Sequence, residues 1–213
     1  MITVQGVFQP DEVDALQHFF ATVRPDPGVT KLAQVSDVKN SQVESLLSRV
    51  AAVAQTLNRE LFGADTALSK IWFQRTASVS PSEFDVDRTP FRPHIDTHRK
   101  RKAMIYVNDV GENDGPFYSS FLDPNSFESG RAQASRRIER GITTPKEEWD
   151  ALLADVNPES FRPVLGSAGS IHVFDTNTPH FAGTPVGERE RSVIRLDFKE
   201  KRRGGLDRIV TRL

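Results

Sequence analysis

A series of short strand-like segments, separated by glycine and proline turns, is the feature that most limits the folds open to this chain. Branched and aromatic residues dominate each segment, and turn residues stand between them. Strands are expected at residues 68–79, 91–98, 103–108, 117–122, 171–174 and 191–198. Several short strands at such spacing are typical of a β-sandwich or barrel. We therefore expect a mainly β, jelly-roll barrel with helices added to it.

Two stretches before residue 67 have apolar residues at helical spacing instead. Residues 10–23 begin at Pro10, which suits a first helical turn, and residues 41–62 end before Gly63, which suits a C-terminal cap. Ser41 with Glu44 has the spacing of a capping box. We expect both helices to support one face of the sheet.

Residues 123–163 are polar, charged and partly helical, and are longer than a routine connection between strands. A lid and a solvated helical face are both open readings of this insert. The chain as a whole (1–213) is expected to be one domain. It would comprise N-terminal helical support (1–67), a core with this insert (68–198) and a basic tail (199–213).

Composition excludes several classes of function. The 213 residues include no cysteine, so disulfides, zinc–thiolate sites and thiol nucleophiles are ruled out. With 28 basic and 29 acidic residues the net charge is −1, which gives no reason to expect nucleic acid or an anionic membrane as a partner. The sequence contains no apolar run of spanning length. We expect a cytoplasmic protein, and the sequence indicates no oligomeric state.

The motif His94-Ile95-Asp96, together with His180, is the strongest candidate for a chemical site. Side chains two positions apart on a strand share a face, so His94 and Asp96 would point the same way. Two imidazoles and one carboxylate make up the facial triad typical of non-heme Fe(II) oxygenases. The bland alternative is an exposed ion pair, with His180 capping a turn. His172 and His98 are expected to be non-ligands.

The expected strand 68–79 has an unusual polar face that includes Gln74 and Thr76. This face indicates either the lining of a cavity or simple exposure to solvent. The polar loop 80–90 precedes the candidate metal strand, so it is expected to rim the site.

The segment from His94 to Phe198 resembles the double-stranded β-helix core of the Fe(II)/2-oxoglutarate-dependent oxygenases. It has the H-x-D motif, the distal His180, and Arg191 about ten residues later. The run RKAMIYVN at 101–108 and the segment after His180 are similar to the prolyl-hydroxylase-like and phytanoyl-CoA hydroxylase-like branches. The resemblance implies that the two histidines and Asp96 bind Fe(II), while 2-oxoglutarate and O2 take the open positions.

The resemblance also implies roles for residues around the metal. Arg191 would bind the distal carboxylate of 2-oxoglutarate, because a guanidinium matches a carboxylate bidentately. The further candidates for cosubstrate binding are Tyr106, Thr97 and Gln74. Arg195 shares a strand face with Arg191, so it is expected to reach a second acidic group, on the substrate.

The expected reaction is hydroxylation of a small polar molecule, an amino acid or a peptide side chain, with release of succinate and CO2 and with ascorbate as an optional reductant. Halogenating relatives replace the carboxylate ligand, whereas Asp96 is present here. Desaturation and cyclisation stay open. The alternatives are a cupin-like metal-binding module without turnover and a partner-binding protein acting through the basic segment 131–140.

Overall fold

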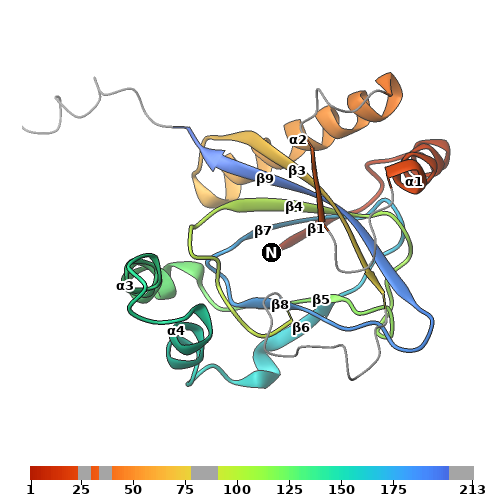
Figure 1. The fold of residues 1–213 in the computed structure, drawn as a ribbon. Helices are drawn as coiled ribbons and strands as arrows, with labels where there is room; N and C mark the ends of the chain where they lie inside the picture. Colours follow the sequence, from red (N-terminus) through yellow and green to blue (C-terminus); the bar gives the residue numbers. More distant parts are fainter. Residues whose placement is uncertain (24–29, 34–39, 78–90, 202–213) are drawn as a thin grey trace, which may run out of the picture.

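The computed structural model describes residues 1–23, 30–33, 40–77 and 91–201 (Figure 1). Its strands are β1 (Ile2–Val4), β2 (Thr30–Ala33), β3 (Thr66–Ala77), β4 (Arg101–Tyr106), β5 (Phe117–Ser120), β6 (Phe161–Val164), β7 (Ile171–Asp175), β8 (His180–Ala182) and β9 (Glu190–Glu200). Its α-helices are α1 (Pro10–Val23), α2 (Ser41–Phe62), α3 (Glu128–Glu139) and α4 (Pro145–Leu152), and two short 3-10 helices are η2 (Pro124–Phe127) and η3 (Pro158–Ser160).

Two antiparallel sheets face each other. The large sheet has the order β1-β7-β4-β9-β3-β2 and the small sheet the order β6-β5-β8. Figure 1 shows α1 and α2 over the outer side of the large sheet, and α3 and α4 beside one end of the two sheets. The expected mainly β fold, with N-terminal supporting helices and a helical insert, is confirmed. The described strands form two separate sheets, and no closed barrel joins them.

The large sheet separates two cores. On its outer face, residues of β3, β4, β7 and β9 such as Ile71, Ile105 and Ile194 pack under the apolar stripes of α1 and α2. On its inner face, Met104, Tyr106 and other side chains meet residues of the small sheet. The polar residues expected on one face of β3 therefore lie between the sheets, where a cavity can form.

Both N-terminal helices begin and end as the sequence predicts. Gly63 caps α2 with φ +60°, and its N–H donates to Asn58 O. The N-terminal cap of α2 is Asn40, whose side chain accepts from Val43 N, so the capping box predicted at Ser41 is wrong. The capping box that the insert does contain joins Thr144 to Glu147 at the start of α4.

The predicted strand 91–98 is also wrong. This segment is an irregular loop that makes one β-bridge, between His94 and His180. Pro93 has no N–H to donate, so a continuous ladder cannot run through this position. The loop 80–90 and most of the basic tail lie outside the described residues, and the rim and tail predictions stay untested. Within the described chain, no helix combines the length and apolarity that crossing a bilayer requires.

Candidate metal centre

His94, Asp96 and His180 converge between the sheets. One ligand atom from each lies within 4.8 Å of the others. Oδ1 of Asp96 is 3.9 Å from Nε2 of His94 and 3.7 Å from Nε2 of His180. Both imidazoles are buried. The sequence-predicted triad is therefore a spatial cluster, with two nitrogens and one carboxylate oxygen facing a common point.

The backbone fixes this convergence. His94 and His180 are bridge partners, with N···O distances of 3.0 and 2.9 Å in the two directions. Asp96 N donates to Thr176 O at 3.1 Å, which attaches the carboxylate-bearing loop to the end of β7. The irregular loop therefore achieves what the predicted strand was expected to achieve, because each ligand position is hydrogen-bonded to a strand or its end.

Hydrogen bonds assign the tautomer of both histidines. His94 Nδ1 lies 2.8 Å from Arg92 O, and His180 Nδ1 lies 2.7 Å from Thr178 O. A carbonyl oxygen only accepts, so each Nδ1 carries the proton and each Nε2 presents a lone pair to the cluster. Burial, aided by the neighbouring His180, lowers the pKa of His94 to about 3. His94 is thus neutral at ordinary pH, as a metal ligand must be.

Lys102 is part of the site although the sequence did not single it out. Its Nζ lies 2.6 Å from Oδ2 of Asp96, whereas Oδ1 is the oxygen nearer to the two imidazoles. Burial alone would raise the pKa of Asp96, but the Lys102 ammonium and the two imidazoles outweigh it and hold that pKa well below its usual value. The carboxylate is therefore ionised, with Oδ2 engaged and Oδ1 facing both imidazoles.

The helical insert supports the ligand loop from outside. Ile95, between the two ligands, is fully buried and packs with Ala134 of α3 and Trp149 of α4. Thr97 O accepts from Ser135 Oγ at 2.6 Å and also from an arginine of α3. The insert therefore packs against the loop that carries His94 and Asp96 and supports it.

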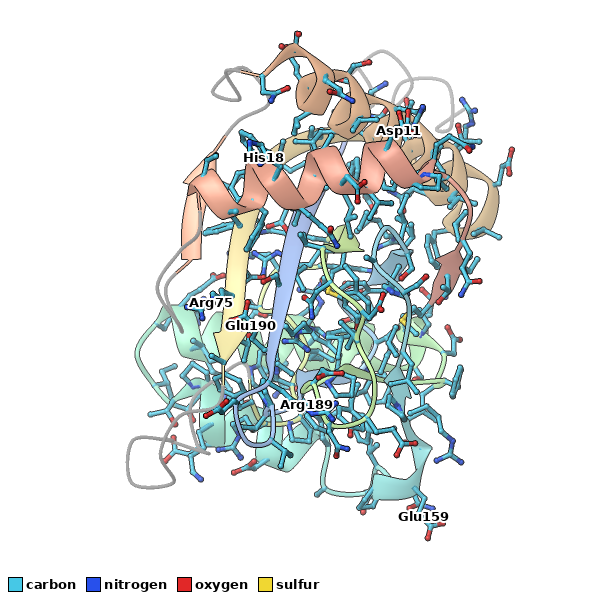
Figure 2. All side chains as sticks on the ribbon, turned by 90° about the vertical axis from the view of Figure 1, so that its right-hand side faces the viewer. Asp11, His18, Arg75, Glu159, Arg189 and Glu190 are labelled. Carbon is cyan, nitrogen blue, oxygen red and sulfur yellow. The ribbon has the colours of Figure 1, made fainter. Side chains whose placement is uncertain are left out.

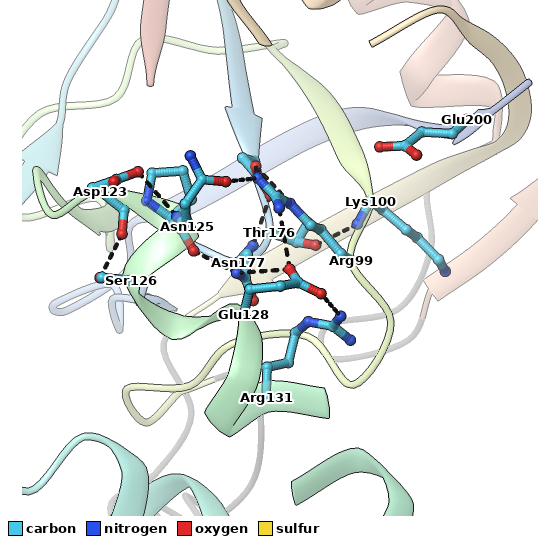
Figure 3. A network of polar contacts seen from close by, with 12 residues as sticks. Arg99, Lys100, Asp123, Asn125, Ser126, Glu128, Arg131, Thr176, Asn177 and Glu200 are labelled. Atoms are coloured by element: carbon cyan, nitrogen blue, oxygen red, sulfur yellow. Dashed lines mark hydrogen bonds and ion pairs between the residues drawn. The ribbon is translucent and has the colours of Figure 1, made fainter. Parts of the chain in front are cut away.

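A polar network fixes the end of the same loop (Figure 3). Arg99 donates to Asp175 and Asn125 and pairs with Glu128 on α3. Lys100 N donates to Thr176 Oγ1 at 2.8 Å. These contacts join α3, the loop and β7, so the position of Asp96 depends on three separate segments.

The cluster lies at one side of a cavity of about 290 Å³ between the sheets. The lining residues are Gln74, Thr76, His94, Asp96, Lys102, Met104, Phe117, Phe174, His180, Ala182, Arg191, Val193 and Arg195. Gln74 and Thr76 on the polar face of β3 thus line the cavity, and both side chains are partly buried. A small cavity with a few convergent polar groups is typical of a small-molecule site.

Arg191 is a buried cation without a carboxylate partner in the described chain. One Nη1 hydrogen bond goes to Gly115 O, and Nε is buried with no partner. Burial of an unpaired guanidinium is unfavourable, and here it lowers the pKa of Arg191. Such a group is suited to an anionic ligand that enters the cavity. Figure 2 shows this end of β3 and β9, where Arg75 and Glu190 form an ion pair of 2.6 Å.

The structure divides the remaining predicted residues into two groups. Gln74 and Arg195 line the cavity, whereas Tyr106 and Thr97 are not among its lining residues. The Tyr106 hydroxyl is buried and donates to Val164 O at 2.7 Å, so its single proton is already engaged. Thr97 contributes its carbonyl to the insert, as described above. Neither side chain lines the cavity in this structure, and their roles in cosubstrate binding stay predictions.

Lys102 was missed because the strand was expected to begin at residue 103. β4 begins at Arg101, and the alternation of side chains places Lys102 on the same inward face as Met104. His172 and His98 lie outside the cluster. His172 is fully buried beside Thr3 Oγ1, and the His98 imidazole is 3.8 Å from a glutamate on the surface.

Comparisons by sequence give no relative. No protein-family model matches the chain, and no curated protein matches it.

Comparison of folds gives many similar structures. One is SnoK, a non-heme alpha-ketoglutarate-dependent carbocyclase from nogalamycin biosynthesis. Its TM-score is 0.63 at 14% identity, and the match covers 100% of this chain and 85% of the SnoK chain. EctD from S. alaskensis with bound Fe has a TM-score of 0.60 at 16% identity, and the match covers 93% of this chain and 72% of the EctD chain.

HygX from Streptomyces hygroscopicus, with nickel and 2-oxoglutarate bound, has a TM-score of 0.55 at 17% identity, covering 94% of this chain and 82% of its own. The predicted resemblance is thus confirmed at the level of the fold, which this chain shares with 2-oxoglutarate-dependent oxygenases.

Proposed function

We propose that this chain is a single-domain, non-heme Fe(II)/2-oxoglutarate-dependent dioxygenase that hydroxylates a small polar molecule, an amino acid or a peptide side chain. One observation carries the proposal. A cluster of two imidazoles and one carboxylate shares a single cavity with a buried guanidinium that lacks an acidic partner among the described residues.

The donor set fits Fe(II). His94 and His180 would each provide Nε2 and Asp96 would provide Oδ1, which is the facial arrangement of non-heme iron enzymes and leaves positions open. Ferrous iron, when bound, supplies the activation of O2. The chain itself keeps His94 neutral, orients both imidazoles through their Nδ1–H groups, and shields the site within the two sheets.

Arg191 fits the distal carboxylate of 2-oxoglutarate. Its unpartnered Nε and its burial match a planar anion that enters from the cavity. Gln74 also lines the cavity and is our second candidate for this cosubstrate. The overall reaction balances as 2-oxoglutarate, O2 and R–H giving succinate, CO2 and R–OH. One oxygen atom enters succinate and the other enters the hydroxylated product.

The fold comparison supports this proposal, because similar structures carry iron or a divalent metal with 2-oxoglutarate. Desaturation and cyclisation would use the same site.

The test measures 2-oxoglutarate binding by calorimetry with Zn(II)-loaded protein, and succinate formation with Fe(II) and O2. We expect Arg191→Gln to weaken 2-oxoglutarate binding about 10- to 100-fold, since it removes a charge-assisted contact of about 1.5–3 kcal/mol. The matched control is Arg189→Gln, because Arg189 is exposed, two residues away, and pairs with Asp114 on the surface.

Metal binding should be lost in Asp96→Ala and in His180→Ala. If the protein binds a divalent metal but neither binds nor decarboxylates 2-oxoglutarate, the dioxygenase proposal fails, and a metal-binding module without turnover would explain the site.

A further inference from the structure

The cavity contains a second guanidinium, at the opposite end from Arg191. Both side chains project inward from β9, four residues apart, which corresponds to about 13 Å along an antiparallel strand. Arg191 is level with Thr76, whereas Arg195 is level with Trp72 and Met104, beside the Lys102 end of the cavity. This spacing along the strand favours separate roles for the two cations, with Arg191 at one end of the cavity and Arg195 towards Lys102.

Arg195 is held rigidly by three partners. Its Nε donates to Asp197 Oδ1 at 2.9 Å, and its Nη1 donates to Gln74 Oε1 at 3.3 Å. Its guanidinium carbon lies 4.9 Å from the centroid of Trp72, and Trp72 Nε1 donates to Asp197 Oδ2 at 2.9 Å. Within the described chain, Nη2 of Arg195 makes no hydrogen bond. One edge of a preorganised donor therefore stays available to the cavity.

The balance of charges around the cavity also favours an anionic ligand. Among the described residues, the cations Lys102, Arg191 and Arg195 outnumber the carboxylates Asp96 and Asp197 by one. A ferrous ion and the dianion of 2-oxoglutarate cancel each other, so the surplus of one positive charge among the described residues persists when both are bound. In a space of low dielectric an uncompensated charge is costly, and one further anionic group would neutralise it.

We propose that the substrate is a small monocarboxylate whose carboxylate binds Nη2 of Arg195, at the Lys102 end of the cavity. This inference rests on the proposed function, since it takes Arg191 as the 2-oxoglutarate anchor. It also narrows that function. A zwitterionic amino acid or a neutral molecule leaves the surplus charge in place, whereas a simple organic acid removes it. The apolar lining from Met104, Phe117 and Phe174 suits the hydrocarbon part of such an acid.

The test compares a carboxylate with its neutral isostere. Phenylacetate and phenylacetamide are titrated into protein loaded with Zn(II) and 2-oxoglutarate, and binding is followed by saturation-transfer difference NMR. We expect phenylacetate to bind at least about tenfold more tightly than the amide, and Arg195→Gln to remove that preference. Arg195→Lys should retain part of it, because the charge stays while the planar fork is lost. Arg189→Gln should leave it unchanged.

A double variant and a measurement of 2-oxoglutarate binding separate loss of the Arg195 contact from general damage to the site. Arg195→Gln leaves Asp197 buried with a lost partner, so the double change Arg195→Gln with Asp197→Asn provides a charge-balanced variant. That variant should also lose the preference for phenylacetate. Binding of 2-oxoglutarate should persist in both variants.

Loss of 2-oxoglutarate binding in the Arg195 variants would assign Arg195 to the cosubstrate and overturn this inference. Equal binding of phenylacetate and phenylacetamide by the unaltered protein would also overturn it, while intact 2-oxoglutarate binding would leave the proposed dioxygenase function standing. Absence of 2-oxoglutarate binding in the unaltered protein would instead count against the proposed function itself.

Discussion

Replacing Lys102 by Met tests how the protein manages the charge of the candidate metal ligand Asp96. Met is similar in length and apolar, so it should fill the same space in the cavity wall without the ammonium. In the metal-free protein the ammonium is the cation closest to this carboxylate, at 2.6 Å. We expect Lys102→Met to destabilise the metal-free protein and to increase the affinity for a divalent metal.

The magnitude follows from the geometry. At 2.6 Å the Coulomb attraction is about 6 kcal/mol with an effective dielectric constant of about 20. Part of that is offset because Lys102 no longer has to be desolvated, so the expected net loss of stability is about 3–5 kcal/mol. A divalent metal at Oδ1 then replaces the missing cation and is no longer repelled by it. We therefore expect at least about tenfold tighter metal binding, or about 1.4 kcal/mol.

The assay is urea unfolding in the presence of a chelator and in the presence of Zn(II), together with calorimetric titration of the metal. Lys100→Met is the matched control, because it removes the same charge two residues earlier without an ion pair to Asp96. Metal affinity that is unchanged or weaker in Lys102→Met would refute the reasoning. It would mean that the ammonium helps to orient the carboxylate more than it competes with the metal.

Three other changes test the surroundings of the site. His172→Leu should reduce the loss of stability on acidification, because burial lowers the pKa of His172 from 6.5 to about 4. The stability that the neutral imidazole contributes is present above pH 6.5 and is lost as the pH falls towards 4. In the Leu variant, about 3 kcal/mol of the pH dependence of the unfolding free energy, measured with urea, should therefore be absent. Trp149→Ala should cost about 3–5 kcal/mol in the same assay and also weaken Zn(II) binding, since Trp149 packs on Ile95 between two ligands. Gly115→Ala should weaken 2-oxoglutarate binding by calorimetry, because a Cβ at this φ of +67° would lie 2.5 Å from the backbone of the 183–185 turn and displace the carbonyl that holds Arg191.

The sequence predicted the parts of the fold that depend on local pattern. The helix at 41–62 was expected from its apolar spacing and from Gly63, and it occurs with those bounds. The clustering of His94, Asp96 and His180 was expected from residue types and order, and the structure brings them together.

What the sequence did not predict depends on contacts between distant segments. The start of β4 was predicted two residues too late, so Lys102 was not assigned to the strand. Pairing with β7 and β9 sets this boundary, and the local sequence does not show it. The engagement of the Tyr106 hydroxyl by Val164 could not be foreseen, since the partner lies 58 residues away. The role of the insert as a support for Ile95 is likewise a tertiary contact with no local signature.

The direct pairing of His94 with His180 has a consequence for how the protein matures. The two imidazoles belong to bridge partners 86 positions apart, so one of the three ligands is missing until the chain between them has folded. A metal ion therefore cannot nucleate folding here in the way that it does in domains whose ligands lie close together in sequence. Closure of this long loop is expected to be slow, because contacts between distant residues form slowly. The metal should therefore bind late in folding, after the two sheets have assembled.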